Sequence, residues 1–147
     1  MNKQTLIVVV RGIPGSGKST YAKTLKADLE KQGFKVEHIE ADDYWYNDKG
    51  EYVFHTSKLY YAHKNCFERV FSAFDNGAAY VIVANTFVTR KDLKPYLKEA
   101  EARGIKVMIY RMDNEFQNVH NVPADKVAYM KEHFVDQENE IKIKRRI

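Results

Sequence analysis

Residues 11–20 have the sequence "RGIPGSGKST", and from Gly12 to Ser19 they match the pattern G-x-x-x-x-G-K-[ST]. An apolar, β-branched run precedes the pattern at residues 6–10, and a helical pattern follows it. A strand before and a helix after are the context in which this pattern forms a phosphate-binding loop, or P-loop. Its glycines allow a tight turn in which backbone N–H groups point inward, and the N-terminus of the following helix adds partial positive charge. The stretch therefore predicts a site for a ligand that carries phosphate.

The last two residues of the pattern, Lys18 and Ser19, carry side-chain chemistry. A lysine at this place neutralises the β and γ phosphates, and a serine hydroxyl is a ligand for Mg2+, which takes few protein ligands besides. We therefore expect the loop to bind ATP with Mg2+, and Ser19 to be the metal ligand. The predicted nucleotide-binding residues are Gly12, Pro14, Gly15, Ser16, Gly17, Lys18, Ser19 and Thr20.

A second interpretation of the same glycines is a dinucleotide-binding fingerprint. Gly15 and Gly17 have the G-x-G spacing, and the acidic residue Glu40 ends the second predicted strand. Thr20, however, stands where the third glycine of that fingerprint belongs. A glycine-rich turn without any ligand is a further alternative. The P-loop interpretation is preferred because the lysine and the serine that it requires are both present.

Length and composition favour one domain that spans residues 1–147. A chain of 147 residues with 44% hydrophobic content can bury one sizeable core. The net charge of +4 is compatible with a polyanionic partner and equally with an ordinary enzyme that binds phosphate. Cys66 is the only cysteine, which excludes an intrachain disulfide, and the apolar runs are too short to span a membrane. We expect a cytoplasmic protein with no membrane partner; the composition leaves the oligomeric state open.

Strand-like and helical patterns alternate along the chain, which is typical of an α/β fold with a parallel sheet and crossover helices. Between residues 89 and 104, Pro95 would remove a backbone donor from a helix, so we predict a short turn from Thr89 and a helix that begins at Pro95. The other predicted elements are strands at 5–10, 35–40, 80–84 and 106–110, and helices at 18–32, 59–74 and 123–134.

The segment "ADDYW", residues 41–45, follows the second predicted strand and should lie at the same sheet edge as the P-loop. We predict that Asp42 is the base that accepts the proton of an attacking hydroxyl, because phosphoryl transfer depends chiefly on position and charge. The alternative is that Asp42 and Asp43 only cap a turn or a short helix, and this alternative is stronger for Asp43. Tyr44 and Trp45, in what we expect to be an exposed loop, could stack on a base or pack over the core.

Four segments together resemble a known family of small P-loop kinases that includes the phage-type polynucleotide 5′-hydroxyl kinases, with an AAA-like ATP-binding domain. The resemblance implies a three-layer P-loop NTPase sandwich, with a parallel sheet of four or five strands and a small helical lid at roughly residues 112–134. It also implies that Lys18 and Ser19 handle ATP and magnesium, that Asp42 is the general base, and that the γ phosphate goes to a 5′-hydroxyl end of DNA or RNA. The segments are "RGIPGSGKST", "ADDYW", "VIVANTFVTRKDLKPY" and "NVHNVPADKV".

The sequence departs from this family at two places that matter for catalysis. The family commonly has an acidic residue at the end of the third strand, where this chain has Ala84 and Asn85. Asn85 is then a candidate for binding the substrate or a metal-bound water. The family also has an arginine in the lid that stabilises the transferring phosphate, and Gln117 occupies its position. Lys126 and Arg111 are the candidates for replacing it.

A third departure concerns the phosphate acceptor. Trp45 stands where the phage-type enzymes have an arginine that contacts a substrate phosphate. This leaves room for a nucleoside-like or other small hydroxyl substrate beside the nucleic acid 5′ end. A nucleotide-binding module with little turnover is a third interpretation, although a pure binder would need no Asp42. The predicted substrate-binding residues are Asp43, Tyr44, Trp45, Asn85, Thr86 and Arg90, and the predicted lid residues are Asn118, His120 and Lys126.

Other polar residues have less specific interpretations. His55, His63 and Cys66 could in principle bind a metal, but the apolar pattern around the last two favours core packing. Arg90 could hold a phosphate at the mouth of the site or simply begin a solvated helix. The basic tail at residues 141–147 could contact a nucleic-acid backbone, although such tails are more often solvated.

Overall fold

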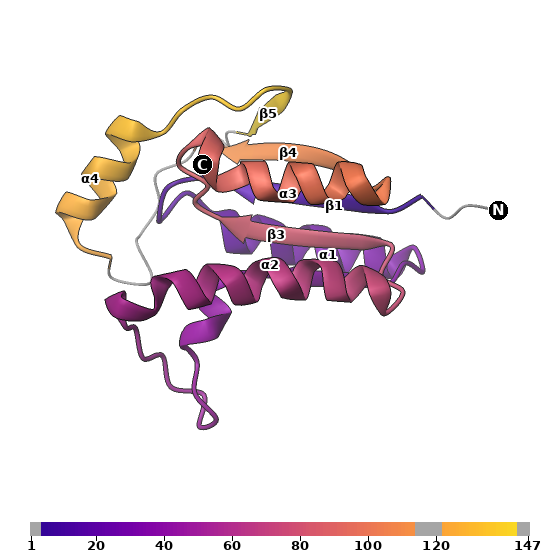
Figure 1. Ribbon diagram of the computed structural model, residues 1–147, viewed down its shortest axis with the longest axis horizontal. Coiled ribbons are helices and arrows are strands. Elements are labelled where there is room, and N and C mark those ends of the chain that lie inside the picture. Colours follow the sequence, from indigo (N-terminus) through magenta and orange to yellow (C-terminus); the bar gives the residue numbers. More distant parts are fainter. Residues whose placement is uncertain (1–3, 114–121, 144–147) are drawn as a thin grey trace.

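A five-stranded sheet forms the centre of the protein (Figure 1). The computed structural model describes residues 4–113 and 122–143. All neighbouring strands are parallel, and their spatial order is β2-β3-β1-β4-β5. The strands are β1 (Leu6–Arg11), β2 (Val36–Ile39), β3 (Tyr80–Asn85), β4 (Lys106–Met112) and β5 (Glu140–Ile143).

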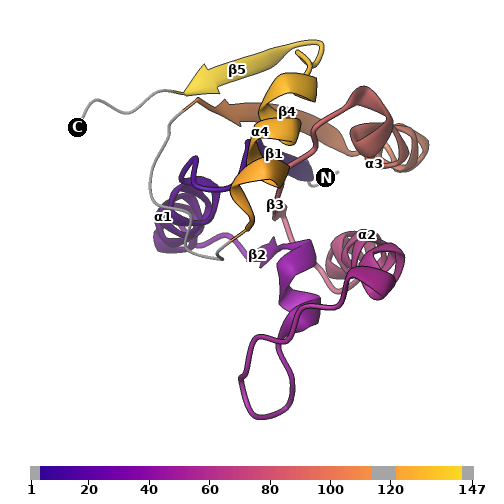
Figure 2. The ribbon, with the colours of Figure 1, turned by 90° about the vertical axis from the view of Figure 1, so that its left-hand side faces the viewer.

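Helices cover both faces of this sheet, as the end view in Figure 2 shows. Side chains alternate along β1, so that Ile7 and Val9 join a core with α2 and α3, whereas Val8 and Val10 join a core with α1. The fourth helix, α4, lies beyond the carboxyl ends of the strands (Figure 1). The predicted three-layer P-loop sandwich is therefore confirmed. The helices are α1 (Lys18–Lys31), α2 (Leu59–Asp75), α3 (Arg90–Arg103) and α4 (Ala124–His133).

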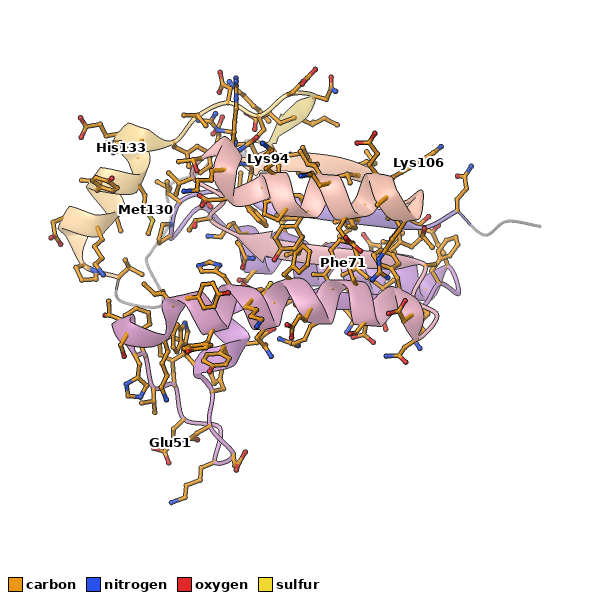
Figure 3. The ribbon with its side chains drawn as sticks, viewed as in Figure 1. Glu51, Phe71, Lys94, Lys106, Met130 and His133 are labelled. Atoms are coloured by element: carbon orange, nitrogen blue, oxygen red, sulfur yellow. The ribbon has the colours of Figure 1, made fainter. Side chains whose placement is uncertain are left out.

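The best predicted elements are those that bury apolar side chains at a regular spacing. Residues 7–10 of β1 are at most 3% exposed, which explains why the strand is apolar without alternation. Along α2, the buried residues Cys66, Val70 and Phe71 recur at helical spacing and face the sheet. Figure 3 shows Phe71 between this helix and α3, where its ring lies near that of Tyr96.

The predicted exposed loop after β2 is wrong in its first part. Residues Ala41–Trp45 form a 3-10 helix, and both Ala41 and Trp45 are buried. A capping box explains this turn, because the Glu40 amide donates to Asp43 Oδ2 at 3.0 Å and the Glu40 side chain accepts from the Asp43 amide. Residues 46–52 then form a hairpin that projects from the body, with Glu51 near its tip (Figure 3). A second 3-10 turn, Thr56–Lys58, leads into α2.

The helix predicted to begin at Pro95 in fact begins earlier. Helix α3 runs unbroken from Arg90 and contains Pro95. Thr89 and Asp92 form a capping box in which the Thr89 amide donates to Asp92 Oδ2 at 3.0 Å. This cap provides hydrogen-bond partners for backbone groups in the first turn. Pro95 lies close enough to that turn for the loss of its one backbone N–H donor to be tolerated.

Strand β5 is a further difference from the prediction. Residues 141–143, which we expected to belong to a basic tail, pair with β4 at the edge of the sheet. The strand is short and half exposed, and Glu140 at its start is held by buried Arg11 from β1. The sequence pattern of four residues could not reveal such a distant partner. The rest of the predicted tail, 144–147, lies outside the described residues.

Candidate active site

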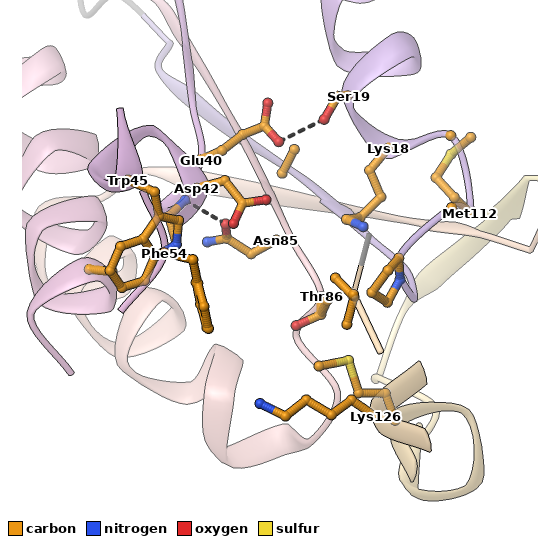
Figure 4. A pocket seen from close by; sticks show the side chains of 18 of the residues that line it. Lys18, Ser19, Glu40, Asp42, Trp45, Phe54, Asn85, Thr86, Met112 and Lys126 are labelled. Atoms are coloured by element: carbon orange, nitrogen blue, oxygen red, sulfur yellow. Dashed lines mark hydrogen bonds between the residues drawn. The ribbon is translucent and has the colours of Figure 1, made fainter. Parts of the chain in front are cut away.

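A cavity of about 690 Å³ opens at the carboxyl ends of the central strands (Figure 4). Its phosphate side is lined by the P-loop and the start of α1, and its floor by the ends of β2 and β3. The 3-10 helix at residues 41–45, the following hairpin, the start of α2 and one face of α4 form the other walls. Segments distant in the sequence thus meet around one space that is large enough for a ligand.

The P-loop has the backbone that its glycines predict. Gly15 and Gly17 adopt φ angles of +84° and +92°, which glycine adopts without strain. A Cβ atom at Gly12 would collide with the Ser16 hydroxyl, so this position also requires glycine. Gly12 and Ser16 shape the loop from behind, while the other predicted nucleotide-binding residues line the cavity: Pro14, Gly15, Gly17, Lys18, Ser19 and Thr20.

Lys18 points into the cavity from the start of α1 (Figure 4). Its ammonium donates to the Ile13 carbonyl oxygen at 3.2 Å. Burial lowers the pKa of Lys18 to about 8, although the nearby charges of Glu40 and Asp42 act in the opposite direction. Burial removes the water that stabilises the positive charge of this ammonium, and a phosphate group beside it would stabilise that charge instead.

Asp42 faces the same cavity from the 3-10 helix after β2, with Lys18 across the space (Figure 4). Asn85 at the end of β3 positions this turn, because its Oδ1 accepts the Ala41 amide at 2.8 Å. Tyr52 from the hairpin hydrogen bonds to Asp42, and burial followed by the Asp42 charge raises the pKa of Tyr52 to about 12. The sheet edge thus holds the turn that carries Asp42, and the hairpin holds its carboxylate.

Glu40 is a site residue that the sequence analysis did not assign to this chemistry. Its Oε1 accepts a hydrogen bond from Ser19 Oγ at 2.7 Å, and its Oε2 lies 2.9 Å from His38 Nε2. Burial alone would raise the pKa of Glu40, but the contacts with His38 and Ser19 and the charge of Lys18 outweigh it and keep that pKa below its usual value. An acidic residue at the end of β2, two positions before the predicted base, was the available signal.

The acceptor side of the cavity is mainly aromatic and apolar. Trp45, Tyr52 and Phe54 come from the 3-10 helix and the hairpin, and the Lys126 ammonium of α4 lies 5.9 Å from the centre of the Phe54 ring. Trp45 is buried and its ring packs edge-on against Phe54. Tyr52 and Phe54 were not predicted, because their place depends on the hairpin that follows the 3-10 helix.

The structure brings four of the predicted substrate and lid residues into the cavity wall and leaves others away from it. Asp43 caps the 3-10 helix and accepts from Arg69 at 3.3 Å, which agrees with the capping alternative. Tyr44 does not line the cavity, and Arg90 donates to the Asp136 carbonyl oxygen at 3.4 Å. The predicted residues that line the cavity are Trp45, Asn85, Thr86 and Lys126, whereas Asn118 and His120 lie outside the described residues.

Of the two cations considered as replacements for a lid arginine, only Lys126 faces the cavity. Arg111 is engaged elsewhere, by Asp113 at 2.8 Å, Asp136 at 2.5 Å and Glu140 at 3.3 Å. The described part of the predicted lid is α4 with the residues before it, and Lys126 projects from this helix into the site.

The proposed packing role is confirmed for Cys66 and wrong for His63. Cys66 is fully buried, and its sulfur accepts from Asn85 Nδ2 at 3.4 Å. His63, one turn earlier, is exposed and lines the cavity. Within residues 4–113 and 122–143, no group of three or more His, Cys, Asp or Glu side chains could hold a metal ion.

The family relationship follows from the match of this sequence to a family model. Residues 7–134 match the model of the AAA domain family. The chain belongs to this family. It is 30% identical to an uncharacterized protein of Pasteurella multocida, with the alignment covering 94% of this chain and 82% of that one. It is also 30% identical over 138 residues to human NEDD4-binding protein 2, covering 88% of this chain but only 8% of that protein.

Solved structures confirm the P-loop fold. The Mycobacterium tuberculosis APS kinase CysC, in complex with AMPPNP and APS, aligns with a TM-score of 0.65 at 13% identity, covering 96% of this AAA domain chain and 90% of the other. Kti12 of Chaetomium thermophilum, in complex with ADP-AlF3, aligns with a TM-score of 0.64 at 11% identity, covering 94% and 88%. In the described part of the AAA domain, no helix is both long and apolar enough to cross a bilayer.

Proposed function

We propose that this AAA domain protein is an ATP- and magnesium-dependent kinase that transfers the γ phosphate of ATP to a hydroxyl group, with the 5′-hydroxyl end of DNA or RNA as the first candidate acceptor. The observation that carries the proposal is the position of Asp42, which faces the P-loop lysine across one cavity and leaves an aromatic space beside it. A protein that only stores nucleotide has no need of a carboxylate at that place. The two structural relatives in complex with AMPPNP and with ADP-AlF3 support nucleotide binding in this fold.

On the phosphate side, the residues of the P-loop would bind the nucleotide. Backbone N–H groups of the loop and the N-terminus of α1 would contact the phosphate oxygens, and Lys18 would neutralise the charge between the β and γ phosphates. Ser19 is the residue that would hold the magnesium ion. Such an ion would supply positive charge to the phosphate oxygens as the bond to the leaving group breaks.

On the acceptor side, Asp42 would take the proton of the attacking hydroxyl. The hydroxyl oxygen forms a bond to the γ phosphorus, the bond from that phosphorus to the bridging oxygen breaks, and ADP leaves. Tyr52 and Asn85 would hold the carboxylate and its turn in place during this step. Lys126 would approach the transferring phosphate from α4, in the role that a lid arginine has in the family that the sequence resembles.

The aromatic walls fit a flat ring, which both candidate acceptors supply. The rings of Trp45 and Phe54 could stack on the terminal base of a nucleic acid or on a nucleoside. A specific observation favours the smaller acceptor as a second candidate. Among the described residues that line the cavity, Lys18 and Lys126 are the only lysines, and none is an arginine. Lys18 would be occupied by ATP. A nucleoside-like molecule brings no backbone phosphates that need cations of their own.

The test is transfer of label from γ-labelled ATP in the presence of magnesium. The acceptors are 5′-hydroxyl DNA, 5′-hydroxyl RNA, a set of nucleosides, and a control without acceptor. Label on oligonucleotide ends supports the first acceptor and label on nucleosides supports the second. If ATP binds with no transfer to any of them, and Asp42→Asn behaves like the wild type, the nucleotide-binding module replaces the kinase proposal.

A further inference from the structure

We infer that Glu40, which directly follows β2, is the protein carboxylate of the magnesium site and takes the role for which the end of β3 provides no acid. This inference rests on the proposed function in one respect, because it needs a nucleotide that brings magnesium into the P-loop. It adds to the metal site a residue that lies outside the P-loop pattern, at the end of a different strand. It also replaces the idea that Asn85 binds a metal-bound water.

The first support is the contact between Glu40 and Ser19. The hydroxyl of Ser19, the expected metal ligand, donates to Glu40 Oε1 at 2.7 Å (Figure 4). The two oxygen atoms therefore lie next to each other beside the P-loop. Hydroxyl and carboxylate oxygens are ligand types that Mg2+ accepts directly or through its waters. Ser19 and Glu40 would together hold such an ion, one through its hydroxyl oxygen and the other through its carboxylate.

The second support is that the other candidate groups at this edge are engaged. Asn85 uses its Oδ1 for the Ala41 amide, and its Nδ2 points at the Cys66 sulfur. Ala84, the preceding residue, has no polar side chain. Asp42 is bound by Tyr52 on the hairpin side. Of the two carboxylates that line the cavity within the described part of the chain, Glu40 is the one in contact with the P-loop serine.

The third support is the way in which Glu40 is held. Its second oxygen, Oε2, lies 2.9 Å from His38 Nε2, so that Oε1 is the oxygen turned toward Ser19. The Glu40 side chain is only 14% exposed, and the charge of Lys18 lies near it. A carboxylate that has a second polar side chain beside its other oxygen resembles the carboxylate ligands of metals, which commonly have a supporting group behind them. His38 lies in that supporting place behind Glu40.

The small number of side chains available as metal ligands also agrees with magnesium. Mg2+ keeps several waters and binds through one or two carboxylates together with substrate phosphates. One serine, one carboxylate and the phosphates of ATP satisfy that pattern. A zinc site would need about four nitrogen or sulfur ligands, and the described residues contain no such group.

The experiment compares Glu40→Gln with Glu37→Gln, a matched change on the exposed side of β2. Mn2+ serves as the probe, and its affinity for the protein–ATP complex is measured by electron paramagnetic resonance. ATP affinity without metal is measured by calorimetry in EDTA. We expect Glu40→Gln to weaken Mn2+ binding by about tenfold or more, with metal-free ATP affinity unchanged or increased because one negative charge is lost. Glu37→Gln should match the wild type in both measurements.

Unchanged Mn2+ affinity in Glu40→Gln, with normal ATP binding, would overturn the inference and leave the kinase proposal standing. Failure of the wild type to bind ATP would instead overturn the kinase proposal itself. If Glu40→Gln does not fold, Glu40→Asp decides the matter, since it keeps the charge but withdraws the oxygen by one methylene. Weaker Mn2+ binding in Glu40→Asp supports the assignment, and wild-type Mn2+ binding overturns it.

Discussion

Replacing Asn85 by alanine tests how the end of β3 positions the predicted base. In the wild type, Asn85 Oδ1 accepts the amide of Ala41 at 2.8 Å, and Ala41 is only 8% exposed. Asn85→Ala leaves this buried amide without its acceptor, which costs about 1–3 kcal/mol. A loss near 2 kcal/mol should lower the melting temperature by roughly 4–8 °C in a domain of this size.

The same substitution should also reduce turnover. The 3-10 helix that carries Asp42 loses one of its anchors, and a shift of about 1 Å can cost up to about 100-fold in rate. We expect kcat to fall while ATP affinity stays within about twofold, because the P-loop is not touched by this change. Melting curves and initial rates of label transfer measure the two effects.

Asn47 provides a matched control for Asn85. Its Oδ1 accepts the amides of Lys49 and Glu51, both at 2.9 Å, in an exposed turn of the hairpin. Water can replace this acceptor, so Asn47→Ala should cost little stability. If Asn85→Ala proves no more destabilising than Asn47→Ala, the reasoning about the buried amide is wrong.

Four further predictions concern single side chains of the cavity. Asp42→Asn should lower kcat by about 10²–10⁴-fold with nearly unchanged ATP affinity in calorimetry; equal rates would refute its role as the base. Tyr52→Phe should lower kcat several-fold at constant ATP affinity, because Asp42 loses a hydrogen bond; a change confined to KM would argue against this. Lys126→Met should lower kcat by about 10²-fold or more and spare the stability measured in urea. The pKa of Lys18 is lowered to about 8, so between pH 8 and about 10.5 the folded state binds fewer protons than the unfolded state. The unfolding free energy of the ATP-free wild type should therefore rise with pH in this window, relative to that of Lys18→Met. If the difference in unfolding free energy between the two proteins does not change with pH, the burial argument is contradicted.

The sequence predicted those parts of the molecule in which one local pattern decides the structure. The P-loop is one, since its glycines, lysine and serine are specified residue by residue. Strand β1 and helix α2 are others, because their apolar spacing is regular. Pro95 misled the prediction because a cap formed by Thr89 and Asp92, three residues apart, outweighs the missing donor.

The rest depended on contacts between segments far apart in the chain. Glu40 meets Ser19, 21 positions away, because β2 and α1 lie side by side. Phe54 reaches the cavity only because a hairpin follows the 3-10 helix. His63 looked like part of an apolar stripe, yet it lies at the end of α2 that reaches beyond the sheet and into the cavity wall. Periodicity places a residue on an element but does not reveal which neighbour that element meets.

Arg11 sets a practical limit on where this domain can be cut. Its guanidinium is fully buried and donates to the carbonyl oxygens of Phe87 at 2.6 Å and Val135 at 2.8 Å, besides its pairing with Glu140 at 2.5 Å. The family match ends at residue 134, before two of these partners. A recombinant fragment trimmed to that boundary would strand a charge in the interior directly below the P-loop, at a cost of about 3–5 kcal/mol. Expression of this fold, alone or excised from a longer protein, should therefore retain the edge strand.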